Sequence, residues 1–266
     1  MTNIYSLRKK YLRIEKTTFC AGCGYGIFTN CFLKAAEELE KEGKFDFHKT
    51  IFISGIGCAA WIPNPYFLAE TLHTTHGRAL AFATGVKLAK PASKIVVISG
   101  DGDLATIGGN HLIHTLRRNL PMSIFCLNNY VYGMTGGQPG ATTPQKTITP
   151  VTPEGSIEKP FDIIKLALGA EAKFVSRYPI VFPKNLIKGI KKNLLIGNEK
   201  SAFTEVISIC PTHFGRKNNL TSPAKMLEAQ KEQYISKKKA LETQNPEQKK
   251  VFGDFESLDE YFNLTK

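Results

Sequence analysis

Short apolar runs alternate with longer helical stretches along most of the chain, and this alternation constrains the fold more than any other feature. The candidate strands, rich in β-branched and aromatic residues, are 50–54, 94–99, 123–127, 172–177 and 203–209. The candidate helices between them are 24–42, 77–89, 104–118, 161–168 and 184–195. Runs such as Ile-Val-Val-Ile are apolar on both faces, which is typical of buried parallel strands. The pattern predicts an α/β fold with a doubly wound, mostly parallel sheet and right-handed crossovers.

Length and charge narrow the class of protein. The chain has 266 residues, enough for one large α/β domain or two smaller ones. Lysine and arginine outnumber aspartate and glutamate by 35 to 23, and a net charge of +12 favours an acidic partner. No basic run is interleaved with aromatic residues, so we expect no nucleic-acid groove. Residues 1–19 lack an apolar signal segment, and no stretch reaches the ~18 apolar residues of a membrane span. We therefore expect a cytoplasmic protein with reduced cysteines and no membrane partner.

Two segments depart from the α/β alternation. The stretch 130–160 is rich in Gly, Thr and Pro, and a loop of this length is typically functional or mobile. Beyond Cys210 the sequence becomes polar and helix-prone, and Ser257 with Glu260 matches a capping box. We divide the chain accordingly into a binding domain, 1–215, and a C-terminal arm, 216–266. The arm packs on a partner, wraps the domain or is a solvated tail.

Several candidate strands end in residues that carry chemistry. These endings are Gly-Ile-Gly-Cys (55–58), Gly-Asp-Gly-Asp (100–103), Asn-Asn (128–129) and Cys-Pro (210–211). In an open parallel sheet, ligands bind outside the carboxyl ends of the strands. Parallel strands would bring all these endings to one edge, so we expect the functional site there.

Asp101 and Asn129 are the strongest candidates for metal ligands at this edge. Gly100 and Gly102 let the backbone turn sharply beside a ligand, and the following helix directs N–H groups towards a phosphate. One strand–helix–strand unit separates Asp101 from Asn129, so both side chains can reach one ion. A carboxylate, an amide oxygen and the Val131 carbonyl, completed by diphosphate oxygens and water, make an octahedral Mg²⁺ site.

The cysteines fall into two groups. Cys31 lies in an amphipathic helix and Cys126 in an apolar strand, so both are expected in the core. The others lie in turns flanked by glycine or proline, at Cys20, Cys23, Cys58 and Cys210. Four thiolates make a soft site for zinc or for an iron–sulfur cluster, and the chemistry of the residues leaves both open. A thioredoxin-like role for the first pair is disfavoured, because no predicted strand precedes it.

The diphosphate motif points to a known family. Gly100-Asp101-Gly102 with Asn128-Asn129 resembles the motif of thiamine-diphosphate enzymes. Neighbouring segments narrow the resemblance: GIGCAAWIP, LHTTHGRALAFATGVKLA, GDGDLATIGGNHLIHTLRRN and NNYVYGMTGGQ. Together they resemble the β subunit of 2-oxoacid:ferredoxin oxidoreductases, over roughly 20–210.

The resemblance implies roles for individual positions. Asp101, Asn129 and the Val131 carbonyl would hold Mg²⁺. Thiamine diphosphate would be lined by Ile56, Gly57, Cys58, Ala59, His76, Gly102, Asp103, Gly133 and Met134. A [4Fe–4S] cluster, rather than zinc, would be held by Cys20, Cys23, Cys58 and Cys210.

The resemblance also implies an activity. The chain would be the β subunit of an obligate complex that converts a 2-oxoacid and coenzyme A into an acyl-CoA, with electrons passing through the cluster to ferredoxin. The glutamate that activates thiamine is expected on a partner α subunit, because the chain has no room for a second domain of that type. The sequence is most like the 2-oxoglutarate versions. Pyruvate or a branched-chain acid is an alternative substrate, since Trp61 occupies a position that is basic in some relatives.

Two other functions fit part of the pattern. A thiamine-dependent decarboxylase or synthase half, acting without oxidation, would need the diphosphate motif but no cluster. An electron-transfer or scaffold subunit would retain the motif without using it.

Overall fold

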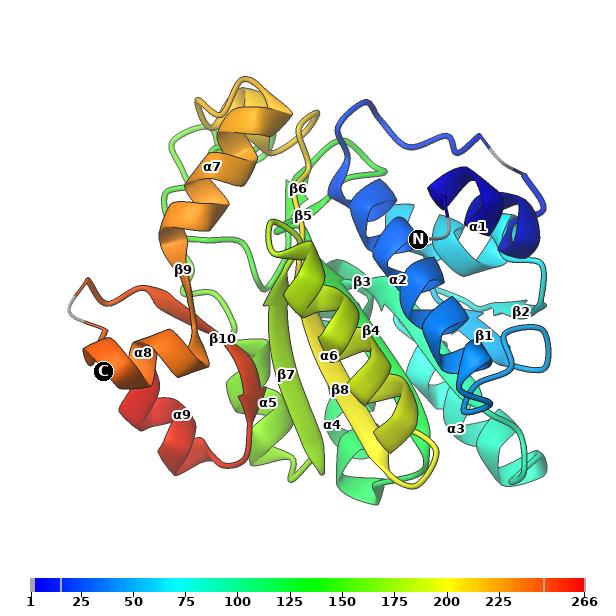
Figure 1. The fold of residues 1–266 in the computed structure, drawn as a ribbon. Helices are drawn as coiled ribbons and strands as arrows, with labels where there is room; N and C mark the ends of the chain where they lie inside the picture. The colour runs from blue at the N-terminus through cyan, green and yellow to red at the C-terminus, as the bar shows by residue number, and fades with distance from the viewer. Residues whose placement is uncertain (1–2, 15, 246, 266) are drawn as a thin grey trace.

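The chain folds around a single large sheet with helices on both faces (Figure 1). The computed structural model describes residues 3–14, 16–245 and 247–265, and in this part the main sheet has eight strands in the order β2-β1-β3-β4-β8-β7-β10-β9. The strands are β1 (Ile51–Ser54), β2 (Glu70–His73), β3 (Ile95–Gly100), β4 (Met122–Asn128), β7 (Phe174–Pro179), β8 (Ser201–Ile207), β9 (Tyr234–Ser236) and β10 (Lys250–Phe255).

The strands from β2 to β7 in this order all run parallel to their neighbours. β10 is antiparallel to β7, and β9 is parallel to β10 at the edge. The carboxyl ends of β1, β3, β4 and β8 therefore share one edge, as the sequence predicts.

The helices cover the two faces of the sheet. They are α1 (Ile4–Tyr11), α2 (Gly24–Lys41), α3 (Ala79–Ala89), α4 (Gly109–Arg118), α5 (Ile163–Gly169), α6 (Pro183–Ile196), α7 (Pro223–Gln233), α8 (Lys237–Thr243) and α9 (Leu258–Thr265). In Figure 1, α2 and α6 lie in front of the sheet, and α3, α4 and α5 lie behind it.

The core has two halves, one on each face of the sheet. Along β3, Val96 and Ile98 join the cluster under α2 and α6, while Ile95 and Val97 join the cluster under α3 and α4. Alternate residues of one strand feed opposite faces, which explains why both sides of the strand are apolar.

The predicted elements are mostly confirmed. Each of the five candidate strands and four of the five candidate helices correspond to an observed element within about two residues. The predicted helix 104–118 is wrong at its start. Residues Gly102–Ile107 form a π-helical turn, closed by the Gly108 N–H on the Asp103 carbonyl at 2.9 Å, and α4 begins only at Gly109. Gly108 lies against the Gly77 carbonyl, where an added Cβ would come within 2.9 Å of the oxygen, and this close packing fixes the break.

The C-terminal arm packs on the domain. Its strand β10 continues the main sheet, with Gly253 paired to Arg177, so the alternative of a solvated tail is wrong. Ser257 Oγ accepts the Glu260 N–H at 3.1 Å, as a capping box requires. The Glu260 carboxylate accepts from the Glu256 N–H, one residue earlier than a standard box.

The loop 130–160 is irregular apart from a short hairpin of β5 (Val131–Tyr132) and β6 (Gln138–Pro139). No helix in the described part of the chain combines the length and apolar character needed to cross a membrane.

Candidate cofactor site at the strand ends

Asp101 follows β3 directly and is almost fully buried. It is 1% exposed, and burial raises the pKa of its carboxyl group to about 6. Its oxygens accept hydrogen bonds from the Asn129 N–H at 3.3 Å and from the Thr142 hydroxyl. Burying an ionised carboxylate in this way is costly unless a cation compensates it. The environment of Asp101 therefore fits a metal ligand.

The turn after β4 carries the two other predicted ligands, Asn129 and Val131. Asn129 Oδ1 accepts the Val131 N–H at 3.1 Å, which curls the turn back on itself. Val131 pairs with Pro139 in the β5–β6 hairpin, and Pro139 has no N–H to donate. The hairpin ladder therefore does not occupy the Val131 carbonyl oxygen. A carboxylate, an amide oxygen and a carbonyl are the oxygen donors that suit Mg²⁺.

One small cavity of about 60 Å³ collects these groups. The three predicted magnesium ligands and all nine predicted thiamine-lining residues border it. The turn glycine Gly100 borders it too, and three residues that the sequence analysis did not single out complete its wall: Tyr25, Tyr132 and Thr135. The predicted residues thus come together, while their binding roles stay predictions.

His76 and Asp103 face each other at this cavity. His76 Nδ1 lies 2.8 Å from Asp103 Oδ1, yet in the described residues this buried nitrogen has no partner in hydrogen-bonding geometry. Asp103 Oδ1 instead accepts from the Ile56 N–H at 3.1 Å and the Gly77 N–H at 2.7 Å. Asp103 thereby fixes the two loops that carry Ile56 and His76. Because Nδ1 faces Asp103, the His76 ring is held at the wall of the cavity.

The turn cysteines gather beside the same cavity. The pKa of the Cys23 thiol is raised to about 12, first by burial and then by the nearby Cys210, Cys58 and Cys20. The pKa of the Cys58 thiol is raised to about 11, again by burial and then by Cys210 and Cys20. A Cβ placed on Gly133 would lie 3.6 Å from Cys58 Sγ and 3.7 Å from Cys210 Sγ. Thiols that are hard to ionise alone but crowded together fit a cationic centre between them.

The amino end of α2 brings the Cys20–Cys23 turn to this place. The Gly24 N–H donates to the Ile209 carbonyl at 3.1 Å, so the start of α2 is fastened to the residue before Cys210. Gly22 has a φ of +76°, and a Cβ there would lie 2.1 Å from Pro223 Cγ at the start of α7. Only glycine satisfies both the conformation and the close approach of the arm.

The other cysteines lie in the core, and two histidines lie on α4. Cys31 and Cys126 are buried in the two core clusters, which confirms their assignment as core residues. His111 and His114 lie on α4, and His114 Nδ1 accepts from Arg117 Nε at 3.0 Å. Across residues 3–14, 16–245 and 247–265, no group of three or more His, Cys, Asp or Glu side chains is arranged to hold a metal ion. A four-iron cluster keeps its ligand sulfurs farther apart than a single ion does.

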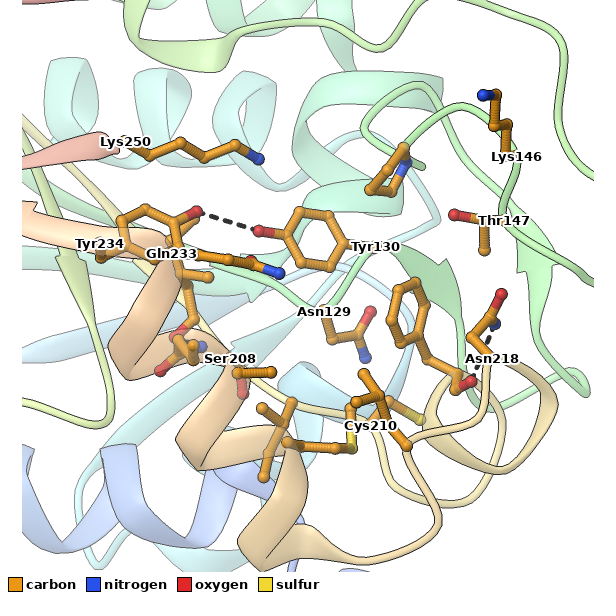
Figure 2. A pocket seen from close by; sticks show the side chains of 18 of the residues that line it. Asn129, Tyr130, Lys146, Thr147, Ser208, Cys210, Asn218, Gln233, Tyr234 and Lys250 are labelled. Atoms are coloured by element: carbon orange, nitrogen blue, oxygen red, sulfur yellow. Dashed lines mark hydrogen bonds between the residues drawn. The ribbon is translucent and has the colours of Figure 1, made fainter. Parts of the chain in front are cut away.

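A second, roomier cavity lies on the far side of Asn129. It measures about 450 Å³, and both Asn129 and Cys210 border it. Figure 2 shows the Tyr130 and Tyr234 hydroxyls paired across it, at 3.1 Å, with Lys250 beside them. Tyr234 and Lys250 belong to the arm, so the arm forms one wall of this cavity.

Sequence reasoning missed Thr142, whose hydroxyl donates a hydrogen bond to the Asp101 carboxylate. Thr142 lies in the irregular loop, and no periodicity marks it. The loop is rich in Thr, Pro and Gly, and this composition marks it as a functional loop without pointing to Thr142.

Comparison with known proteins is consistent with this geometry. Residues 55–206 match the family model described as "Thiamine pyrophosphate enzyme, C-terminal TPP binding domain". The 2-oxoglutarate synthase subunit KorB of Methanothermobacter marburgensis is 46% identical over 250 residues, covering 92% of this chain and 85% of the relative. The 2-oxoacid:ferredoxin oxidoreductase subunit beta of Saccharolobus solfataricus is 37% identical, covering 76% of this chain and 65% of the relative.

A solved structure shows the same fold. The 2-oxoglutarate:ferredoxin oxidoreductase of Magnetococcus marinus, with 2-oxoglutarate, coenzyme A and succinyl-CoA bound, superimposes with a TM-score of 0.81. The two sequences are 30% identical, and the match covers 94% of this chain and 84% of the other.

Fold and site together define a thiamine-diphosphate-binding domain of the α/β type. Within that class, the chain belongs to the family of β subunits of 2-oxoacid:ferredoxin oxidoreductases, which includes the 2-oxoglutarate enzymes.

Proposed function

We propose that this chain is the thiamine- and cluster-binding subunit of a complex that oxidises 2-oxoglutarate with coenzyme A and transfers the electrons to ferredoxin. One observation carries the proposal. Cys58 borders the cavity assigned to thiamine diphosphate and also belongs to the group of turn cysteines. An electron acceptor held there would lie directly beside the reacting carbon. A decarboxylase or synthase that acts without oxidation has no use for such a group of thiols.

The choice of 2-oxoglutarate is supported by the relatives. Several proteins at 46% identity carry the name 2-oxoglutarate synthase, and the Magnetococcus marinus enzyme was solved with 2-oxoglutarate and succinyl-CoA. The relatives at lower identity include a ketoisovalerate oxidoreductase subunit, at 35%. The gradient of identity favours the dicarboxylic substrate.

The residues of this chain divide the work between two groups. Asp101, Asn129 and the Val131 carbonyl would hold Mg²⁺, which would supply positive charge for binding the diphosphate of the cofactor. Thiamine diphosphate supplies a nucleophilic carbon and an electron sink to reactions of this type. Asp103 fixes the loop of Ile56 and the loop of His76 by hydrogen bonds to backbone N–H groups, and so shapes the cavity around the reacting end.

The turn cysteines would hold the [4Fe–4S] cluster. Cys20 is exposed, whereas Cys210 is buried, so the group spans from the cavity wall to the surface. Such a placement suits one-electron transfer from the active site to an external acceptor.

The small size of the cavity is a further argument for a partner chain. Sites for cofactors and drug-sized ligands are usually about 300–1,000 Å³. The cavity of about 60 Å³ in this chain is far smaller. An α subunit that covers the strand ends would complete the enclosure and supply the activating glutamate.

A reconstitution experiment tests the proposal. The chain is co-expressed with its α subunit, purified without oxygen, and assayed for iron, sulfide and extractable thiamine diphosphate. We expect coenzyme-A-dependent reduction of ferredoxin with 2-oxoglutarate, at a kcat/KM well above that for pyruvate or 2-oxoisovalerate. Release of CO₂ without any electron acceptor, from an iron-free complex, would favour the decarboxylase instead. A preference for pyruvate would overturn the substrate assignment alone.

A further inference from the structure

A buried ionic network lies behind the metal-binding turn. Arg177 on β7 donates from Nε to Glu205 Oε2 on β8 at 2.6 Å, and from its terminal nitrogen to Asp162 Oδ1 at 2.8 Å. Arg177 is 7% exposed and Glu205 is 2% exposed. Buried ion pairs of this kind often add little net stability, because removing the charges from water is costly. Stability alone therefore does not explain why these charges are buried together.

The network reaches the turn through Asn128. The Asn128 side-chain amide donates to Glu205 Oε1 at 2.8 Å, and its Oδ1 accepts the Tyr130 N–H at 3.1 Å. Tyr130 has a φ of +70°, a left-handed conformation that aromatic residues rarely adopt. Such a conformation persists only where the surroundings enforce it. Asn128 is thus clamped at both ends of its side chain, and the turn that carries Asn129 and Val131 is held in one shape.

The same network reaches the C-terminal arm through Tyr261 of α9. Arg177 donates to the Tyr261 hydroxyl at 2.7 Å, and that hydroxyl donates to Asp162 Oδ2 at 2.8 Å. A second route is visible in Figure 2, where Tyr234 of the arm contacts the Tyr130 hydroxyl. The arm therefore touches the turn both through β9 and through the chain of charged groups.

We propose that the arm sets the geometry of the metal-binding turn through this chain of hydrogen bonds, with Arg177 and Glu205 as positioning residues. The inference rests on the proposed function in one respect, namely that Asn129 and the Val131 carbonyl hold the Mg²⁺ of the diphosphate. Neither Arg177 nor Glu205 borders the cavity assigned to the cofactor. They act on the ligands through Asn128.

The test removes a hydroxyl at the arm end of the network. Tyr261→Phe keeps the aromatic ring and deletes the contacts with Arg177 and Asp162. A matched control is Tyr178→Phe, because the Tyr178 hydroxyl donates to Asp254 Oδ1 of the arm at 2.8 Å and makes no contact with the network. Both variants lose one buried tyrosine hydroxyl that ties the arm to the sheet.

The readout is cofactor binding by the α–β complex rather than turnover. The complex is stripped of thiamine diphosphate and Mg²⁺, and thiamine diphosphate binding is measured by equilibrium dialysis across a Mg²⁺ series, well below the melting temperature. We expect Tyr261→Phe to weaken Mg²⁺-dependent binding by roughly threefold to tenfold, as for one lost hydrogen bond. Tyr178→Phe should bind as the wild type does, with a similar fall in melting temperature and unchanged iron in both variants.

Glu205→Gln removes the charge of one member of the network. It also leaves Arg177 buried without that carboxylate, so unfolding of the variant would complicate the result. The tyrosine pair avoids this problem. Equal cofactor affinities in Tyr261→Phe and Tyr178→Phe would overturn the inference. If the wild-type complex itself bound no thiamine diphosphate with Mg²⁺, the proposed function would fail, a result distinct from equal affinities in the two variants.

Discussion

At the scale of single residues, Cys58 belongs both to the wall of the cavity assigned to the cofactor and to the group of turn cysteines. It lies in the loop after β1 and borders the cavity assigned to thiamine diphosphate. The pKa of its thiol is raised first by burial, and Cys210 and Cys20 lie close enough to raise it further. Its neighbours at 56 and 57 come from the same loop, which Asp103 holds through the Ile56 N–H. Under the proposed function, this one short loop would set the distance between the reacting carbon and the electron acceptor.

The sorting of the cysteines predicts different outcomes for similar substitutions. Changing Cys20, Cys58 or Cys210 to Ala should lower the iron content of the anaerobically purified complex by at least about twofold, because a cluster ligand is lost. Changing Cys31 or Cys126 to Ala should cost about 1–2 kcal/mol of unfolding free energy through lost packing, with full iron. Iron and sulfide analysis beside thermal melts measures both effects. Equal loss of iron in all these variants would contradict the sorting.

How much of the site follows from sequence depends on whether a residue sits at a strand end. Asp101, Asn129 and Cys210 each follow a buried strand of the parallel sheet, so their meeting at one edge was predictable. The hydrogen bond from Thr142 to Asp101 and the one from Asn128 to Glu205 were not predictable. They depend on the conformation of an irregular loop and on the packing of a buried polar pair. Local pattern carries no information about such contacts.

At the scale of secondary-structure elements, the start of α2 is the critical joint. Gly24 lies so close to the end of β8 that an added Cβ would be 2.8 Å from the Ile209 nitrogen and 2.3 Å from Ser208 Oγ. Two residues on, a Cβ at Gly26 would meet nothing within 4 Å. The two glycines look alike in sequence, yet only the first holds Cys23 beside Cys210.

This contrast gives a matched pair of variants. Gly24→Ala should destabilise the chain by about 1–3 kcal/mol through overpacking and should reduce the iron content, because α2 must move away from β8. Gly26→Ala should leave iron unchanged and stabilise the chain by up to about 1 kcal/mol, since alanine favours a helix over glycine. Denaturant melts and iron analysis distinguish the two. A stable, fully loaded Gly24→Ala protein would show that the contact with β8 is dispensable.

The elements that sequence missed share a cause. β2 is the edge strand of the parallel part of the sheet, and it reads Glu-Thr-Leu-His, with polar residues that give no buried-strand signal. β10 contains Gly253 and follows a polar stretch that predicts helix. Strands of this kind are specified by the partner strand they join more than by their own residues.

At the scale of the whole molecule, the chain encloses the cavity at the strand ends only in part. The strand ends open at a cavity too small for the cofactor, and the arm closes only the side away from β1. Under the proposed function, this architecture and the net charge of +12 would suit two partners of different kinds: a chain that covers the strand ends, and an acidic electron acceptor.

The incomplete enclosure predicts that the chain is inactive alone. Purified without its α subunit, it should show no steady turnover of a 2-oxoacid and should bind thiamine diphosphate at least about tenfold more weakly than the complex, because the cavity buries only part of the ligand. Equilibrium dialysis and a viologen assay before and after addition of the α subunit measure both. Sustained turnover by the isolated chain would contradict the assignment of an obligate complex.

The charge predicts how ionic strength affects electron transfer. Under the proposed function, the net charge of +12 would attract an acidic ferredoxin. This attraction would be screened as the Debye length falls from about 14 Å to about 4 Å between 0.05 and 0.5 M salt. We expect kcat/KM for ferredoxin to fall by roughly tenfold or more over this range, through KM rather than kcat, because encounter is what the field accelerates. Methyl viologen, a dication, provides the matched control, since its reduction should not slow with salt. The measurement is a steady-state titration of each acceptor at fixed 2-oxoglutarate and coenzyme A. If salt slowed both acceptors alike, the effect would lie in the chemistry or the assembly of the complex, and the basic surface would have no part in docking.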